Sequence, residues 1–231
     1  MTRNGLIQNA DHLKQASPLI HWLLRRTGMR LLLPSVIGGL ALIVFAPVSI
    51  AHFRLIEPAS WLQESQLGDP QKMAPCGGTS ADPGKPTGAV ASAQGGERLH
   101  ISLHETLFHP GFYRVALAVN SRDELPPDPE VKTEPSARGP RSISAAIHFP
   151  PVPPILADGL FPHTTKFDKD LETDVELPNI NCAKCTLQIV EFMAAHGRNS
   201  DGDYSYHHCA VLQIHVNPEK PIDTLYPAEK R

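Results

Sequence analysis

The sequence predicts an all-β protein built from short strands. Apolar and polar residues alternate over several short stretches, which is the periodicity of half-buried strands. Loops rich in proline and glycine separate these stretches, and the 231-residue chain contains 23 prolines and 16 glycines. After residue 51 we find no helical pattern longer than a turn or two. We therefore expect a β-sandwich of the immunoglobulin or fibronectin-III type with long loops, preceded by a signal peptide.

The first 51 residues are expected to be removed from the folded product. Residues 1–28 are either an N-terminal extension or a start assigned too early, because Met29 is also a suitable start. Residues 29–51 are predicted to be the signal peptide, with an apolar run of about 17 residues, which is short for a membrane span of about 20. The basic Arg25, Arg26 and Arg30 lie just before or at its start, and they are followed by the apolar run Leu31 to Pro47 and by the small Ser49 and Ala51 before the cut.

The remaining chain is expected to form one sandwich domain, residues 52–217, followed by a polar tail, residues 218–231. Its size is ordinary for a single domain. The strands are predicted at 52–58, 99–104, 112–119, 143–149, 185–193 and 204–216, and the last two form a hairpin around the turn 197–202. Residues 62–97 and 121–142 are expected to be exposed loops, and residues 155–180 to be irregular.

Charge and cysteine content restrict the possible functions. Residues 52–231 carry 16 basic and 23 acidic residues, a net charge of −7, and no basic stripe, which argues against a nucleic-acid partner. We find no hydrolase, zinc-protease, phosphate-loop or dinucleotide motif. All four cysteines follow residue 51, and an even count in an exported chain indicates two disulfides, for which three pairings are possible.

The junction Ser-Ile-Ala-His-Phe, residues 49–53, gives the chain its most specific chemistry. Cleavage after Ala51 makes His52 the first residue, and His52 then offers a metal its α-amine and its imidazole Nδ1. An internal histidine cannot do this, because its backbone nitrogen belongs to an amide. Nitrogen donors in a plane favour Cu(II). The α-amine has an ordinary pKa of about 8, so copper binding displaces a proton and strengthens as pH rises.

Three motifs resemble the lytic polysaccharide monooxygenases, including the bacterial chitin-binding type, and their non-catalytic relatives. They are His52 after the cleavage site, the segment Thr106-Leu-Phe-His109-Pro-Gly-Phe-Tyr113-Arg-Val, and the pair Cys185-Thr-Leu-Gln-Ile with Tyr204-Ser-Tyr206-His-His-Cys209-Ala. Together they span most of residues 52–216. Members of this family are exported copper proteins with a β-sandwich fold, and a histidine brace holds the single copper ion.

The resemblance implies roles for four residues. His52 and His109 would supply three nitrogens in a T-shape, and Tyr206 would lie axial to the copper. His196 resembles a second-sphere histidine that orients bound oxygen. Tyr204 stands where fungal members have a glutamine, which is a departure from their oxygen-activating pattern.

Several histidines compete with these assignments. His104 is the rival of His109 as the second ligand. Strand parity places His208 on the face of Tyr206 and His207 on the other face, so His208 is a further residue near the metal, although a surface or core role is expected for it. His100, His148, His163 and His215 are expected to be structural or exposed.

The resemblance also implies a Cys76–Cys209 disulfide, which leaves Cys182–Cys185 as a local bridge. A Cys-x-x-Cys pair is alternatively redox-active or metal-binding, but no βαβ pattern surrounds it here.

The resemblance is compatible with two functions. The first is oxidative cleavage of a polysaccharide such as chitin or cellulose by a monomeric copper monooxygenase that draws electrons from an external donor. The second is copper binding without catalysis, for acquisition, buffering or delivery. Sugar contacts are expected from Phe53, Trp61, Phe112 and Tyr113. A third function, a metal-free structural domain anchored in a membrane, requires that the signal remain uncleaved; the protein is otherwise expected in the periplasm or outside the cell.

Overall fold

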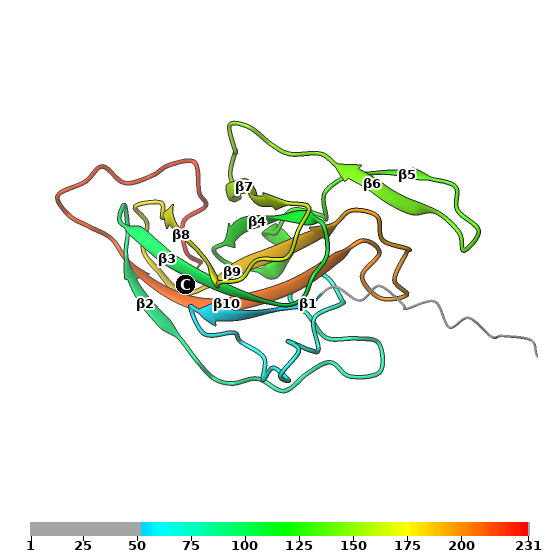
Figure 1. Ribbon diagram of the computed structural model, residues 1–231. Helices are drawn as coiled ribbons and strands as arrows, with labels where there is room; N and C mark the ends of the chain where they lie inside the picture. Colours follow the sequence, from blue (N-terminus) through cyan, green and yellow to red (C-terminus); the bar gives the residue numbers. More distant parts are fainter. Residues whose placement is uncertain (1–51, 231) are drawn as a thin grey trace, which may run out of the picture. The chain divides into compact units, whose positions relative to one another are not determined.

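The computed structural model describes residues 52–230, which form an all-β sandwich (Figure 1). One sheet has three strands in the order β1 (His52–Glu57), β3 (Arg98–Leu107) and β8 (Leu171–Glu176). The second has five strands in the order β2 (Ala91–Gln94), β10 (Ser205–His215), β9 (Cys182–Met193), β4 (Gly111–Ala118) and β7 (Ile155–His163). The predicted extension 1–28 and signal peptide 29–51 lie outside the described residues.

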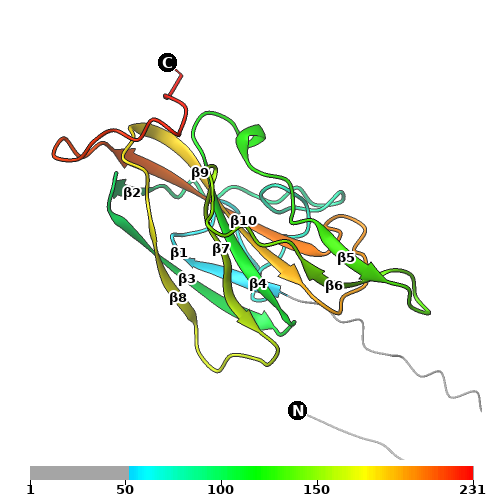
Figure 2. The same ribbon diagram turned by 90° about the horizontal axis from the view of Figure 1, so that it is seen from above.

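The two sheets face each other across one hydrophobic core (Figure 2). The three-stranded sheet contributes residues such as Leu55 and Ile101, and the five-stranded sheet contributes Leu117, Leu187 and Leu212, all of them buried. These residues come from stretches that alternate in the sequence, or from the centres of β4 and β9, which are almost continuously buried. The predicted sandwich is therefore confirmed.

The prediction of an irregular segment at residues 155–180 is wrong. This segment contains β7, paired antiparallel with β4, and β8, paired antiparallel with β3. β7 was hidden because it holds Gly159 and Pro162 and its register against β4 shifts repeatedly. β8 was hidden because only Leu171 and Val175 turn inward, and charged residues lie between them.

The loop predicted at residues 121–142 is also partly wrong. It contains the short 3-10 helix η1 (Arg122–Glu124), and β5 (Val131–Glu134) pairs with β6 (Arg141–Ala145) as a separate two-stranded ribbon. This ribbon extends from the end of the sandwich where β9 ends (Figure 1). Bonds from Ser142 to the Met193 and His196 carbonyls hold it there. The loop at 62–97 is irregular as predicted, apart from β2.

Two disulfides fix the loops to the five-stranded sheet. Cys76–Cys209 spans 133 positions and ties the long first loop to β10. Cys182–Cys185 bridges a 3-residue separation at the start of β9. Both pairings agree with the prediction.

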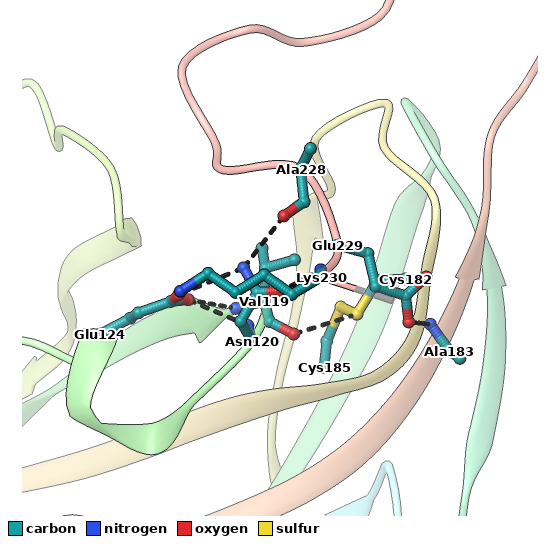
Figure 3. The surroundings of a disulfide bond; sticks show 9 residues. All are labelled: Val119, Asn120, Glu124, Cys182, Ala183, Cys185, Ala228, Glu229 and Lys230. Carbon is teal, nitrogen blue, oxygen red and sulfur yellow. Dashed lines mark hydrogen bonds between the residues drawn. A yellow bond between two sulfur atoms is a disulfide. The ribbon is translucent and has the colours of Figure 1, made fainter.

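The tail after residue 217 packs back on the sandwich rather than running free. Asn120 donates to the Ala228 carbonyl and accepts from the Lys230 backbone, and Glu229 accepts from the Ala183 backbone (Figure 3). These bonds lie next to the Cys182–Cys185 disulfide. No helix within residues 52–230 is long and apolar enough to cross a membrane.

Candidate metal centre

His52 begins β1 and its ring is buried, with 4% of the residue exposed. The Nε2 atom lies 3.2 Å from Asp69 Oδ1 and 3.1 Å from Oδ2. Its Nδ1 atom is buried and has no hydrogen-bond partner among residues 52–230. One nitrogen is therefore held by a carboxylate, and the other is the nitrogen that a histidine brace requires.

Tyr206 lies directly beside His52. It occupies the second position of β10, opposite Glu191 of β9, and its ring meets the His52 ring edge-on at 5.1 Å between centroids. Burial raises the pKa of the phenol above its ordinary value, so the hydroxyl stays protonated. The structure thus brings together two of the residues that the sequence predicted at one site.

His109 lies in the turn between β3 and β4. Its backbone N–H donates to Glu105 Oε1 at 3.3 Å, and its Nδ1 lies 3.5 Å from the Pro110 carbonyl. Burial, together with the nearby His196, lowers the pKa of His109 to about 4, so the ring is neutral at ordinary pH. A neutral imidazole is the form that binds a metal.

His196 packs against His109, with ring centroids 4.8 Å apart in an edge-on contact. It follows β9, where its backbone N–H donates to Ser142 Oγ at 3.0 Å and its Nδ1 contacts the Gly197 carbonyl. The β5–β6 ribbon therefore positions this histidine, which is a contribution that the sequence did not predict.

The β1–β3 pairing brings the two ring pairs to the same end of the sandwich. His52 lies opposite Leu107, and His109 follows only two residues later. Within residues 52–230, however, no three or more side chains of His, Cys, Asp or Glu form a metal-binding group. A histidine brace needs only two imidazoles, because its third nitrogen is the α-amine. The buried Nδ1 of His52 and the neutral ring of His109 fit that donor set.

The rival histidines are occupied elsewhere. His104 is exposed and its Nδ1 lies 2.6 Å from Asp170. His208 shares the inner face with Tyr206, as parity predicted, but its Nε2 bonds to the Phe53 carbonyl and its Nδ1 faces Glu64. His207 lies on the opposite face, between Asp128 and the Lys72 carbonyl.

Two buried carboxyl groups behind the site were missed by the sequence analysis. Glu105 lies 3.0 Å from His163 Nε2, and the His163 side chain is buried, which agrees with the structural role that was one of the two predicted for it. Glu191 is fully buried between Tyr113 and Tyr206 on neighbouring strands, and burial raises its pKa well above the ordinary value. The Tyr113 hydroxyl faces the Glu191 carboxyl across the β4–β9 pairing, and burial outweighs this contact in its effect on the Glu191 pKa. Only the charged residue in an apolar run, Val-Glu-Phe-Met, marked Glu191 in the sequence.

The expected sugar-contacting aromatic surface is wrong. Phe53, Phe112 and Tyr113 are buried in the core, because they point between the sheets or into a side cluster. Trp61 is half-buried, and the Arg122 guanidinium lies 3.6 Å from its ring centre. Next to the turn that holds His109 there is instead an apolar cleft of about 410 Å³, with walls that include Pro110 and Ile143.

Comparison with known proteins gives no assignment. No family model matches this chain, and no curated protein is significantly similar to it. The residues and contacts described above are therefore the basis of the function proposed below.

Proposed function

We propose that the protein is an exported copper-binding protein with a histidine brace made by His52 and His109, related to the lytic polysaccharide monooxygenases. The observation that carries the proposal is the His52 side chain, whose Nε2 is held by Asp69 while its buried Nδ1 has no partner among the described residues. A buried polar atom without a partner is costly unless a ligand satisfies it. Two disulfides fit an oxidising compartment and so support export.

The proposed activity is oxidative cleavage of a polysaccharide, with electrons from an external donor. Copper would supply redox chemistry with oxygen species. Tyr206 packs edge-on against the His52 ring and would lie beside a copper ion held there. His196 packs on His109 and would act as the second-sphere histidine that the resemblance implies. Both residues support a site that does more than hold a metal.

A second candidate, copper acquisition or delivery without catalysis, is favoured by one observation. Three of the four aromatic residues expected to contact sugar, Phe53, Phe112 and Tyr113, are buried, and the fourth, Trp61, is half-buried beneath Arg122. Product analysis after incubation with chitin or cellulose, reductant and oxidant separates the two. Oxidised oligosaccharides establish the first function, and tight copper binding without them establishes the second.

The proposal is tested by comparing a chain that starts at His52 with one that carries a single alanine before it. The extension turns the α-amine into an amide while it leaves every side chain in place. We expect it to weaken Cu(II) affinity by more than the roughly 10–100-fold that loss of an outer partner costs. Equal affinity in a competition titration would refute the brace.

A further inference from the structure

The loop that precedes Gln71 is fixed tightly against β1. The fully buried Gln71 side chain accepts from the Phe53 backbone N–H at 3.1 Å and donates to the Leu67 carbonyl at 3.3 Å. Thr106 Oγ1 lies 3.0 Å from the His52 carbonyl and 2.7 Å from the Leu67 carbonyl. These bonds join three separate segments of the chain at the first residues of β1.

Glycine at position 68 makes this close approach possible. Gly68 has a φ of +100°, and a Cβ built there would lie 1.9 Å from the Phe53 carbonyl oxygen. Any side chain at this position would push the loop away from β1. The close contact between Gly68 and Phe53 therefore fixes the position of the loop. It also fixes the next residue, Asp69, against His52.

The contact between Asp69 and His52 determines the protonation pattern of the ring. A carboxylate accepts, so the proton sits on Nε2, and the lone pair remains on Nδ1. The His52 ring is 5% exposed and Asp69 is 41% exposed, so the carboxylate reaches the buried ring from the solvent side. Carboxylates that hold the outer nitrogen of a metal-bound histidine orient the ring and make it a stronger ligand.

We propose that Asp69 is the positioning residue of the copper site: it directs the lone pair of His52 Nδ1 at the metal and, through its negative charge, favours Cu(II) over Cu(I). This inference rests on the proposed function. It assigns a role to a loop that the sequence analysis expected only to be exposed, and it makes the loop part of the metal centre.

The test compares Asp69→Ala and Asp69→Asn in the chain that starts at His52. Asp69→Ala removes the acceptor, and we expect a roughly 10–100-fold loss of Cu(II) affinity. Asp69→Asn keeps an acceptor oxygen, so it should recover much of that affinity. Both variants should shift the Cu(II)/Cu(I) reduction potential upward, because a negative charge is lost. Circular dichroism and urea unfolding check that each variant is folded.

Asp170→Ala and Asp170→Asn are the matched controls. Asp170 also pairs with a histidine of the three-stranded sheet, His104, but that pair is exposed and belongs to no site. We expect its variants to leave affinity and potential unchanged. NMR of the ¹⁵N-labelled, metal-free protein should further show His52 as the Nε2–H tautomer, with the Nδ1–H form appearing in Asp69→Ala.

The outcomes separate the two proposals. Tight copper binding by the parent protein, with Asp69 variants that behave like the Asp170 controls, overturns the role of Asp69 and leaves the copper site intact. Failure of the parent chain to bind copper overturns both. An affinity loss without a shift of potential or tautomer overturns the positioning role, because it would reflect only a structural contact.

Discussion

The two ends of the sandwich treat buried polar groups in opposite ways. At the end closed by the tail, the buried Asn179 bonds to the backbone of residues 217–221. The half-buried Asn120 bonds to Ala228 and Lys230 (Figure 3). At the other end, His52 Nδ1 is buried without a hydrogen-bond partner among residues 52–230, and burial raises the pKa of the Glu191 carboxyl well above its ordinary value. Unpaired buried groups cost stability, and proteins retain them mainly where function needs them. The difference therefore supports the proposal that the site lies at the His52 end.

The largest expected effect concerns the two disulfides. In the chain-entropy model, replacing Cys76 and Cys209 with alanine destabilises by about 5 kcal/mol, and replacing Cys182 and Cys185 by about 2 kcal/mol. The difference arises because the first bridge spans 133 positions and the second only 3. Urea unfolding of both double variants measures this. Equal losses of unfolding free energy would contradict this difference. They would mean that the tail end depends on the Cys182–Cys185 disulfide more than on its hydrogen bonds.

Apolar substitutions at the two ends should have opposite signs. Asn179 Nδ2 lies 2.9–3.0 Å from three backbone carbonyls and Oδ1 accepts from the Asn217 N–H, so Asn179→Leu should destabilise by about 2–4 kcal/mol. Glu191→Met removes a fully buried carboxyl and keeps the volume, and because burial of that carboxyl outweighs its contact with Tyr113, the variant should be more stable by about 1–2 kcal/mol. Urea unfolding at neutral pH measures both. A loss of stability in Glu191→Met would mean that its carboxyl is satisfied in solution.

The smallest expected effect is the pH response of His109. Its pKa in the folded protein is about 4, below the value near 6.5 of an unfolded histidine, so the unfolded state binds the proton more readily. Stability is therefore present above pH 6.5 and is lost as pH falls toward 4. We expect a loss of about 1–2 kcal/mol, after allowing for solvent screening of the full shift.

Metal-free protein and its His109→Asn variant are compared by urea unfolding between pH 7 and pH 4. The variant cannot titrate at this position, so its stability should fall less steeply. His100→Asn is the control, because His100 is exposed and paired with Asp174. Parallel curves for the parent and the His109 variant would contradict the low pKa.

Local patterns in the sequence were sufficient for some features and insufficient for others. Alternation identified β3, and the apolar runs identified β4, β9 and β10, because their own residues form the core. Parity placed Tyr206 and His208 on one face correctly. β8 escaped because its stability comes from pairing with β3 rather than from its own apolar content.

Only those residues of the candidate site that lie in or next to a sequence motif were predicted. His52, His109, Tyr206 and His196 lie at one end of the sandwich, each in a motif or next to one. Asp69 and Glu191 were not predicted, because their contacts with His52 and Tyr206 depend on the position of a loop or strand that is distant in the sequence. Nothing in the local sequence of residues 62–97 indicates that Asp69 meets His52, because the contact is set by Gly68, Gln71 and Thr106 together.

The most direct test of the account is electron paramagnetic resonance of the Cu(II)-loaded chain that begins at His52. We expect an axial signal with superhyperfine splitting from three nitrogens, which His109→Gln reduces to two. Tyr206→Phe should perturb the same spectrum while most of the affinity remains. A spectrum with fewer nitrogens in the parent protein, or one that His109→Gln leaves unchanged, would contradict the histidine brace.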